Sequence, residues 1–301
     1  MGFLDNAQEV FDKGVSVAKG AVSGVAVEQQ AFMKGFTRLC NDGWNQGWHE
    51  RNGGNLTYRM TPEDVSSCRS FFYDNPSSWV AMGVQADNLR GEFFAVTAAG
   101  AYLRNVALDP DANAGIVEIN PAGDAWRIVW GFKDGAVPTS EFPSHFLCHA
   151  ARKAASAGVD RVLYHAHPTN TVALTNVLPL NARTFTRTLW KAHLESMVAF
   201  PQGIGVVPWT VPGGAEIAGA TADALRSFAA CVWAHHGLIC AGTNYDAAFG
   251  LASAVEKAAS IYVSARAMNG GSGDFASTIP DEGLRGIAEA YRLPVNEEFL
   301  N

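Results

Sequence analysis

The stretch Arg161-Val-Leu-Tyr-His-Ala-His167 joins an apolar run to two histidines at positions i and i+2. Short runs of this kind, with β-branched and aromatic residues, are typical of strands, so we expect a strand over residues 161–167. Alternate side chains of a strand lie on the same face, which places the two imidazoles side by side with their Cα atoms ~6.5 Å apart. The stretch therefore predicts a buried strand that ends in a pair of histidines.

Similar patterns predict the other elements. Further strands are expected over residues 56–60, 93–98, 115–119, 126–131, 205–209 and 231–239. Helices are expected over residues 31–49, 144–156, 181–194, 222–229, 246–268 and 281–292, with Thr221 and Asn244 as N-caps. Early strands followed by strands that alternate with helices favour an α/β or α+β class, with a mixed sheet covered on both faces.

Composition indicates an ordinary globular enzyme. The chain has 301 residues, of which 48% are hydrophobic and 17% are charged, and its net charge is −7. Nucleic-acid binding normally requires a basic surface, so we expect no nucleic-acid partner. We divide the chain into an N-terminal extension, residues 1–27, expected to form a helix, and one domain, residues 28–301. Asp5 and Glu9 interrupt the apolar start, so we expect no signal peptide, no membrane segment and a cytoplasmic protein.

The cysteines give no sign of a disulfide framework. Their number is odd and no C-x-x-C pair occurs, so buried free thiols are expected at Cys40, Cys68, Cys148, Cys231 and Cys240. An alternative is a nucleophilic Cys148, because His145 lies at i−3 on the expected helix.

Three histidines are candidate metal ligands. His165 and His167 can converge on one ion from a strand, and His236 follows an apolar strand and precedes Gly237. Strand alternation would place His236 with Val232 and Ala234, and would turn His235 the other way. Three nitrogen ligands leave a coordination position open, as catalytic zinc sites require. An H-x-H pair alone also fits two structural histidines at a strand end.

Two further segments carry polar groups suited to an anion. Glu141 follows Thr139 and Ser140 at an expected helix start, where it could move protons or simply complement the helix dipole. Free amides and hydroxyls at such a start can also hold a phosphate. The segment Asn52-Gly53-Gly54-Asn55 fits either a plain turn or a backbone nest for an anionic ligand.

In combination these segments resemble the class II aldolases, and within them the rhamnulose-1-phosphate aldolase group. The segments that carry the resemblance are Gly47-Trp-His-Glu-Arg-Asn-Gly-Gly-Asn-Leu-Thr57, Arg104-Asn-Val106, Leu108-Asp-Pro110, Ala136-Val-Pro-Thr-Ser-Glu141, Arg161 to His167 and Trp233 to Gly237. They follow one another in the family's order and run from about Glu28 to the C-terminus.

The resemblance implies a three-layer α/β/α sandwich around a mixed, largely antiparallel sheet, assembled as a homotetramer. It implies one Zn²⁺ per subunit on His165, His167 and His236, proton exchange by Glu141, and assistance by Glu195 from an adjacent subunit. Residues that match the phosphate or dihydroxyacetone site are Asn52, Gly53, Asn55, Thr139 and Ser140. The implied reaction is reversible cleavage of L-rhamnulose 1-phosphate to dihydroxyacetone phosphate and L-lactaldehyde, through a metal-stabilised enediolate.

One departure from the family pattern concerns the phosphate. The chain has Thr97-Ala-Ala-Gly100 where the family usually has Thr-Gly-Ser-Gly, so Ala99 replaces a phosphate-binding serine. Loss of one hydrogen bond to a charged group costs about 1.5–3 kcal/mol, which weakens selection for a phosphorylated substrate. Alternatives are therefore an aldolase for fuculose 1-phosphate or a non-phosphorylated ketose, a pentose-phosphate 4-epimerase, or a non-catalytic interaction module with this fold.

Overall fold

The structure is a computed structural model that describes residues 25–271 and 275–300. The strands in this part of the chain are β1 (Asn55–Arg59), β2 (Val80–Ala81), β3 (Phe93–Thr97), β4 (Ala114–Ile119), β5 (Ala125–Gly131), β6 (Val162–Ala166), β7 (Gly205–Val207), β8 (Ala230–Trp233) and β9 (Gly237–Gly242). The helices are α2 (Ala31–Asn45), α3 (Pro62–Cys68), α4 (Pro110–Asn113), α5 (Phe142–Ala155), α6 (Thr169–Leu174), α7 (Ala182–Ala192), α8 (Leu194–Ala199), α9 (Ala215–Ser227), α10 (Tyr245–Met268) and α11 (Asp281–Tyr291).

The strands form one mixed, largely antiparallel sheet. Their order is β2-β5-β4-β3-β1-β6-β9-β8-β7, and β7 and β8 form its parallel pair within the described residues. Strand β6 lies between β1 and β9, so His165 is opposite Asn55 on one side and Ile239 on the other. The expected histidine strand is therefore central in the sheet.

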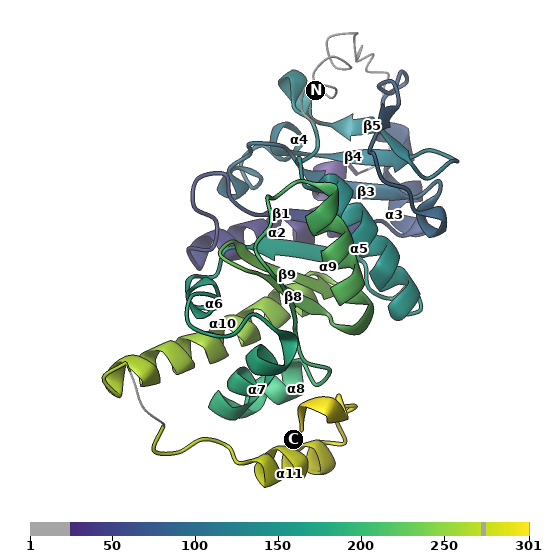
Figure 1. Ribbon diagram of the computed structural model, residues 1–301. Helices are drawn as coiled ribbons and strands as arrows, with labels where there is room; N and C mark the ends of the chain where they lie inside the picture. Colours follow the sequence, from purple (N-terminus) through teal and green to yellow (C-terminus); the bar gives the residue numbers. More distant parts are fainter. Residues whose placement is uncertain (1–24, 272–274, 301) are drawn as a thin grey trace.

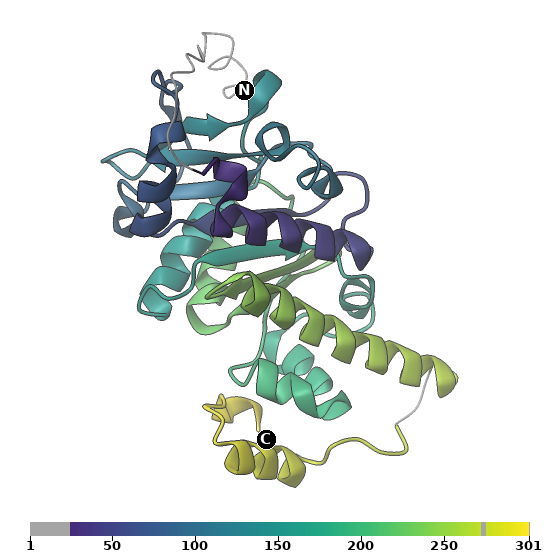
Figure 2. The same ribbon diagram turned by 180° about the vertical axis from the view of Figure 1, so that it is seen from behind.

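Helices cover both faces of this sheet. Figure 1 shows α5 and α9 on one face, and the reverse view in Figure 2 shows α2 and α10 on the other. Phe36 of α2 and Val255 of α10 are fully buried in one core, and Phe146 of α5 and Leu225 of α9 are fully buried against the opposite face. The expected three-layer α/β/α sandwich is confirmed.

The first helix is shorter than its apolar periodicity predicts. It was expected over residues 31–49 but ends at Asn45. Gly47 adopts a positive φ of 74°, its N–H donates to the Trp44 carbonyl, and the Trp48 N–H donates to the Gly43 carbonyl. This is the glycine C-terminal motif that stops a helix and turns the chain, and it directs Trp48 and His49 into the core.

The strand expected over residues 231–239 is wrong as a single element. Strands β8 and β9 form an antiparallel hairpin instead, with Trp233 opposite Gly237. His235 lies in the turn with a left-handed φ of 59°, and its N–H donates to Thr175 Oγ1 at 3.0 Å. An apolar run on both sides hides such a turn, because neither histidine is a strong turn signal.

Two helix starts also differ from expectation. Helix α9 begins at Ala215 rather than residue 222, and Thr221 lies inside it with Oγ1 donating to the Ile217 carbonyl. The same oxygen accepts from Trp233 Nε1 at 2.8 Å, so Thr221 joins α9 to β8. Asn244, by contrast, is confirmed as the N-cap of α10, where its side chain accepts from Ala247 N.

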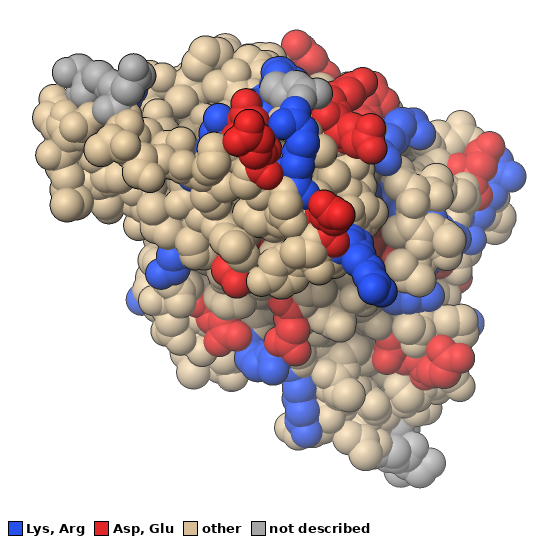
Figure 3. Space-filling view, turned by 90° about the horizontal axis from the view of Figure 1, so that it is seen from below, with Lys and Arg blue, Asp and Glu red and all other residues tan. Residues whose placement is uncertain are grey.

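The outer surface and the chain ends add three observations. Residues 1–24 of the expected N-terminal helix lie outside the described residues. No helix among residues 25–271 and 275–300 is both long and apolar enough to cross a membrane. Seen from below, the molecule carries acidic and basic side chains interspersed on one face, beside an area without charge (Figure 3).

A buried carboxylate fixes the start of α6, the helix that follows His167. Glu256 of α10 is only 9% exposed and accepts four hydrogen bonds of 2.7–2.9 Å from α6. The donors are the backbone and side chain of Asn170 and of Thr171. A negative charge at a helix N-terminus also interacts favourably with the helix dipole. Glu256 therefore joins the longest helix to the segment that bears the histidines.

We predict that Glu256→Ala lowers the free energy of unfolding by about 2–3 kcal/mol, because it leaves buried donors without an acceptor. Urea denaturation followed by circular dichroism measures the change. The exposed Glu289→Ala on α11 is the control and should stay within about 0.5 kcal/mol of the parent. Equal stabilities of the two variants would contradict this role of Glu256.

Candidate metal centre and active site

The two strand histidines lie at the end of β6. His165 is within the strand and 1% exposed, and His167 is the first residue after it. The His167 N–H donates to the Trp48 carbonyl at 3.0 Å, which brings the loop after α2 against this end of the sheet. The two rings lie on the same side with their centroids 5.0 Å apart. The expected pairing of the imidazoles is confirmed.

Hydrogen bonds set the protonation of both rings. His165 Nδ1 lies 3.1 Å from the Leu238 carbonyl oxygen, and His167 Nδ1 lies 2.6 Å from Glu50 Oε1. A carbonyl or a carboxylate oxygen only accepts, so each Nδ1 carries the hydrogen and each Nε2 has a free lone pair in the neutral ring. The two Nε2 atoms are 3.2 Å apart. Two nitrogens at ~2.0–2.1 Å from one tetrahedral zinc ion would be separated by roughly this distance.

The third imidazole comes from the β8–β9 hairpin. The ring of His236 has its centroid 4.9 Å from that of His165 and 5.1 Å from that of His167. One ligand atom from each of the three residues lies within 4.8 Å of the others. His236 Nδ1 is buried and has no hydrogen-bond partner in the described part of the chain. Sequence analysis chose the correct histidine, although the turn and not strand alternation places it.

The environment suits neutral nitrogen ligands. Burial lowers the pKa of His165 well below its usual range, and the neighbouring His167 and His236 lower it further. Burial likewise lowers the pKa of His236 to about 4. Both rings are therefore uncharged near neutral pH, and a neutral imidazole is the form that binds a metal. An unpartnered buried nitrogen and two facing lone pairs fit a metal ion with three histidine ligands.

Two glycines allow the backbone to lie close to the cluster. A Cβ on Gly237 would lie 2.4 Å from the Ala166 carbonyl oxygen and 2.9 Å from a ring carbon of His165. A Cβ on Gly53 would lie 2.9 Å from a ring carbon of His167. Only glycine fits at both places without displacing a histidine.

Glu141 lies beside the histidines, at the N-cap position of α5. Its Oε2 is 3.8 Å from His165 Nε2 and accepts a 2.6 Å hydrogen bond from Asn55 Nδ2. Burial raises the pKa of Glu141, while the bond from Asn55 opposes that rise. A carboxyl group with a raised pKa next to a candidate metal centre is suited to general acid and base catalysis.

The other residues expected to bind substrate lie on two loops. Asn55 is buried at the start of β1, whereas Asn52 is exposed in the preceding turn. Thr139 is buried, its N–H donates to the Thr97 carbonyl at 3.0 Å, and Ser140 next to it is partly exposed. The segment before Glu141 is thereby held against the end of β3, where Ala99 lies.

Glu195 is not part of this cluster within one chain. It is exposed in the first turn of α8, below the sheet in Figure 1. No hydrogen bond or ion pair joins it to the histidines or Glu141 among the residues that the structure describes. Its expected contribution to an adjacent subunit remains a prediction.

Other expectations about histidine and cysteine are settled by burial. His145 and His149 lie under α5, where Thr57 Oγ1 is 2.8 Å from a ring nitrogen of each, so their interpretation as ordinary helix positions missed a buried polar cluster. Burial lowers the pKa of His145 to about 3. The five cysteines are all buried and free. Burial raises the pKa of Cys148 well above its usual value, which argues against a nucleophilic thiol.

Sequence analysis did not identify Glu50 as a partner of His167. The carboxylate side chain is 65% exposed and belongs to the loop after α2. A carboxylate on the second nitrogen of a metal-binding histidine fixes the ring and raises its basicity. A glutamate shortly after a helix end carries no pattern that would indicate such a contact.

Comparison with known proteins agrees with this geometry. The family model described as "Class II Aldolase and Adducin N-terminal domain" matches residues 34–263. A rhamnulose-1-phosphate aldolase of Klebsiella pneumoniae (strain 342) is 41% identical over 270 residues, which cover 90% of this chain and 96% of the relative. One of Escherichia coli O1:K1 / APEC is 41% identical over 265 residues, covering 88% and 95%.

Solved structures agree on the fold. The sugar-phosphate aldolase of Thermotoga maritima superposes with a TM-score of 0.65 at 27% identity, covering 80% of this chain and 96% of that one. The L-fuculose-1-phosphate aldolase of Thermus thermophilus has a TM-score of 0.53 at 21% identity, covering 80% and 97%, which supports the fold alone. The protein described here belongs to the class II aldolase and adducin N-terminal domain family.

Proposed function

We propose that this chain is a metal-dependent aldehyde-lyase that reversibly cleaves L-rhamnulose 1-phosphate to dihydroxyacetone phosphate and L-lactaldehyde. The observation that carries the proposal is the position of Glu141, 3.8 Å from His165 Nε2 at the edge of a three-histidine cluster. Relatives that bear the name rhamnulose-1-phosphate aldolase match nearly their full length at 41% identity and support this substrate. An aldol cleavage assay with L-rhamnulose 1-phosphate tests it directly.

His165, His167 and His236 would hold one Zn²⁺ per subunit. Three neutral nitrogen ligands suit zinc and leave a position for substrate oxygens. When bound, the ion supplies a Lewis acid that stabilises negative charge as the carbon–carbon bond breaks. The hydrogen bonds to Leu238 and Glu50 keep His165 and His167 in the correct orientation throughout.

Glu141 would move the proton at the substrate carbon that becomes nucleophilic. Asn55 Nδ2 engages Oε2, so the proton would be held at Oε1. In cleavage Glu141 would deliver this proton to the carbon of the dihydroxyacetone fragment, and in condensation it would remove it. Burial supports both directions, because a carboxyl group with a raised pKa gains a proton more readily.

The phosphate end of the substrate would lie on the loops that flank this carboxylate. Residues that we assign to it are Asn52, Gly53, Asn55, Thr139 and Ser140. Their placement beside Glu141 and His167 supports the assignment, since Asn55 contacts Glu141 and Gly53 lies against His167. Ala99 offers no hydroxyl here, so the backbone amides and the remaining polar groups would hold the phosphate.

We also propose a homotetramer in which Glu195 of one subunit assists proton transfer in its neighbour. Its exposure on α8 supports this role, because an exposed side chain is free to reach another subunit. Light scattering coupled to size-exclusion chromatography measures the assembly.

We predict that His165→Ala and His236→Ala each remove stoichiometric zinc and aldol cleavage together, because two histidines do not complete the site. Metal analysis of the purified variants and the cleavage assay check both losses. His235→Asn is the matched control, since asparagine tolerates the left-handed turn and this ring does not belong to the cluster. Full zinc content in both alanine variants would disprove the ligand assignment.

Glu141→Gln should keep zinc and slow turnover by about 10² to 10⁴, the usual contribution of a general acid or base. The amide oxygen can still accept from Asn55, so the fold around it is retained. Exchange of the dihydroxyacetone phosphate C3 proton with solvent, followed by NMR, isolates the step. An exchange rate equal to that of the parent would assign the proton transfer to another group.

Ala99→Ser should raise kcat/KM for L-rhamnulose 1-phosphate by roughly tenfold or more, because it restores one hydrogen bond to a charged group. The same substitution should leave cleavage of unphosphorylated L-rhamnulose unchanged. Steady-state kinetics with both ketoses provide the comparison. Equal gains for the two ketoses would show that the hydroxyl does not act on phosphate.

A further inference from the structure

A second polar cavity lies at the opposite end of β1 from the histidines. It has a volume of about 670 Å³ and is lined by β1, α3, the start of β3, the end of α5 and the approach to β6. Asn55 at one end of β1 contacts Glu141, whereas Arg59 at the other end lines this cavity. Four residues along a strand span roughly 13 Å, so the cavity is separate from the metal centre.

Positive charge dominates its walls. Lining side chains with a positive charge are Arg59, Arg69, Lys153 and Arg161, whereas Glu92 is the one lining carboxylate within the described residues. Glu92 pairs with Arg59 at 3.2 Å and with Lys153. The cavity therefore holds three positive charges in excess of its negative charge.

The cations without a carboxylate are positioned by other groups. Arg161 Nη1 donates to the carbonyls of Arg59 and Met60, each at 3.2 Å. Arg69 lies over the Phe93 ring, with its guanidinium carbon 5.5 Å from the ring centroid. Asp64, on the same helix as the lining residue Val65, is engaged with Tyr58 Oη at 2.7 Å and caps α3.

Arg59 adds a second, independent observation. The residue is 3% exposed, and its Nη2 donates to the carbonyls of Gly158 and Asp160. Its Nε is buried and has no hydrogen-bond partner in the described part of the chain. A buried guanidinium N–H normally has an acceptor, so an anionic group in the cavity would complete its hydrogen bonding.

We propose that this cavity binds a small organic phosphate at a site separate from the metal centre. A phosphomonoester dianion offsets more of the excess charge than a carboxylate does, and guanidinium groups match its oxygens in pairs. The volume exceeds that of a bare phosphate, and Phe93, Met60 and Val65 offer apolar walls for the organic part.

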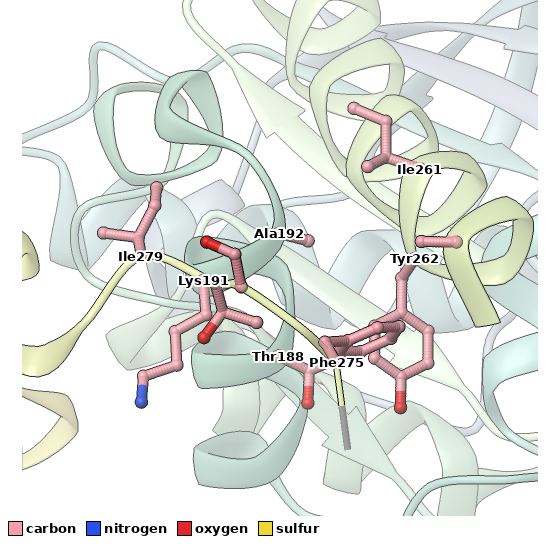
Figure 4. Close-up of a pocket in the computed structure, with 10 residues that line it drawn as sticks. Thr188, Lys191, Ala192, Ile261, Tyr262, Phe275 and Ile279 are labelled. Carbon is pink, nitrogen blue, oxygen red and sulfur yellow. The ribbon is translucent and has the colours of Figure 1, made fainter. Parts of the chain in front are cut away.

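The other large cavity shows the contrast. It lies between α7, α10 and the segment before α11, has a volume of about 450 Å³, and has Tyr262 and Phe275 on its walls (Figure 4). Lys191 is its one cationic lining residue, and Lys191 Nζ already pairs with Asp281 at 2.7 Å. An anion would find no uncompensated charge there.

Phosphorus NMR titration of the full, zinc-loaded chain with inorganic phosphate tests the proposal. The matched pair is Ser66→Glu and Ser66→Gln, because Ser66 is an exposed lining residue and the two new side chains differ in charge but hardly in size. Ser66→Glu should weaken phosphate binding at this cavity by about tenfold or more relative to Ser66→Gln. Identical isotherms for the pair would overturn the site.

A second comparison removes cations. Arg69→Gln together with Lys153→Gln should abolish this binding, while Arg226→Gln, an exposed arginine of α9 that pairs with Asp223, should not. Aldol cleavage should persist in all of these variants. Retention of both binding events in the double variant would refute the assignment.

Two further outcomes separate this site from the proposed active site. Ser140→Ala should affect only the phosphate bound near Glu141, so the cavity can be tested even if the chain cleaves no ketose phosphate. Acetate should bind the cavity at least about tenfold more weakly than phosphate. Equal affinities for acetate and phosphate would rule out the phosphate class.

Discussion

The placement of β6 between β1 and β9 is the constraint on which the candidate site depends. Antiparallel pairing sets His165 opposite Asn55 on one side, and the β8–β9 hairpin returns His236 to the same end. Side chains that are distant in sequence then meet within 4.8 Å, or within 2.6 Å for Asn55 and Glu141. A register shift of one residue would turn His165 to the other face of the sheet and separate all of these groups.

Burial gives these groups their chemistry. The same exclusion of water that keeps His165 and His236 neutral raises the pKa of Glu141. Imidazoles gain lone pairs for a metal and the carboxyl group gains affinity for a proton, both because a low-dielectric environment penalises charge. One physical cause thus prepares the ligands and the acid–base group together. Polar contacts from Asn55 and Glu50 then orient these groups without adding a fixed positive charge.

Much of this arrangement could be predicted from the sequence because it rests on short patterns. The i and i+2 spacing of His165 and His167 defined a strand face, and that face is the observed one. His236 was chosen correctly from its place after an apolar run, but the turn that presents it was missed, since two strands and a tight hairpin resemble one continuous run. The contact of Glu50 with His167 could not be predicted, because it depends on how the loop after α2 packs against the sheet end.

Helix α6 links the two halves of the histidine cluster. It begins two residues after His167, and Thr175, directly after its last turn, binds the backbone of His235 beside His236. Its other anchor is Glu256 in the middle of α10, a helix of 24 residues that extends well beyond the sheet (Figure 2). Axial movement of α10 would therefore be transmitted through one rigid connection to all three imidazoles simultaneously, so contacts at the protruding end of α10 can tune metal affinity from a distance.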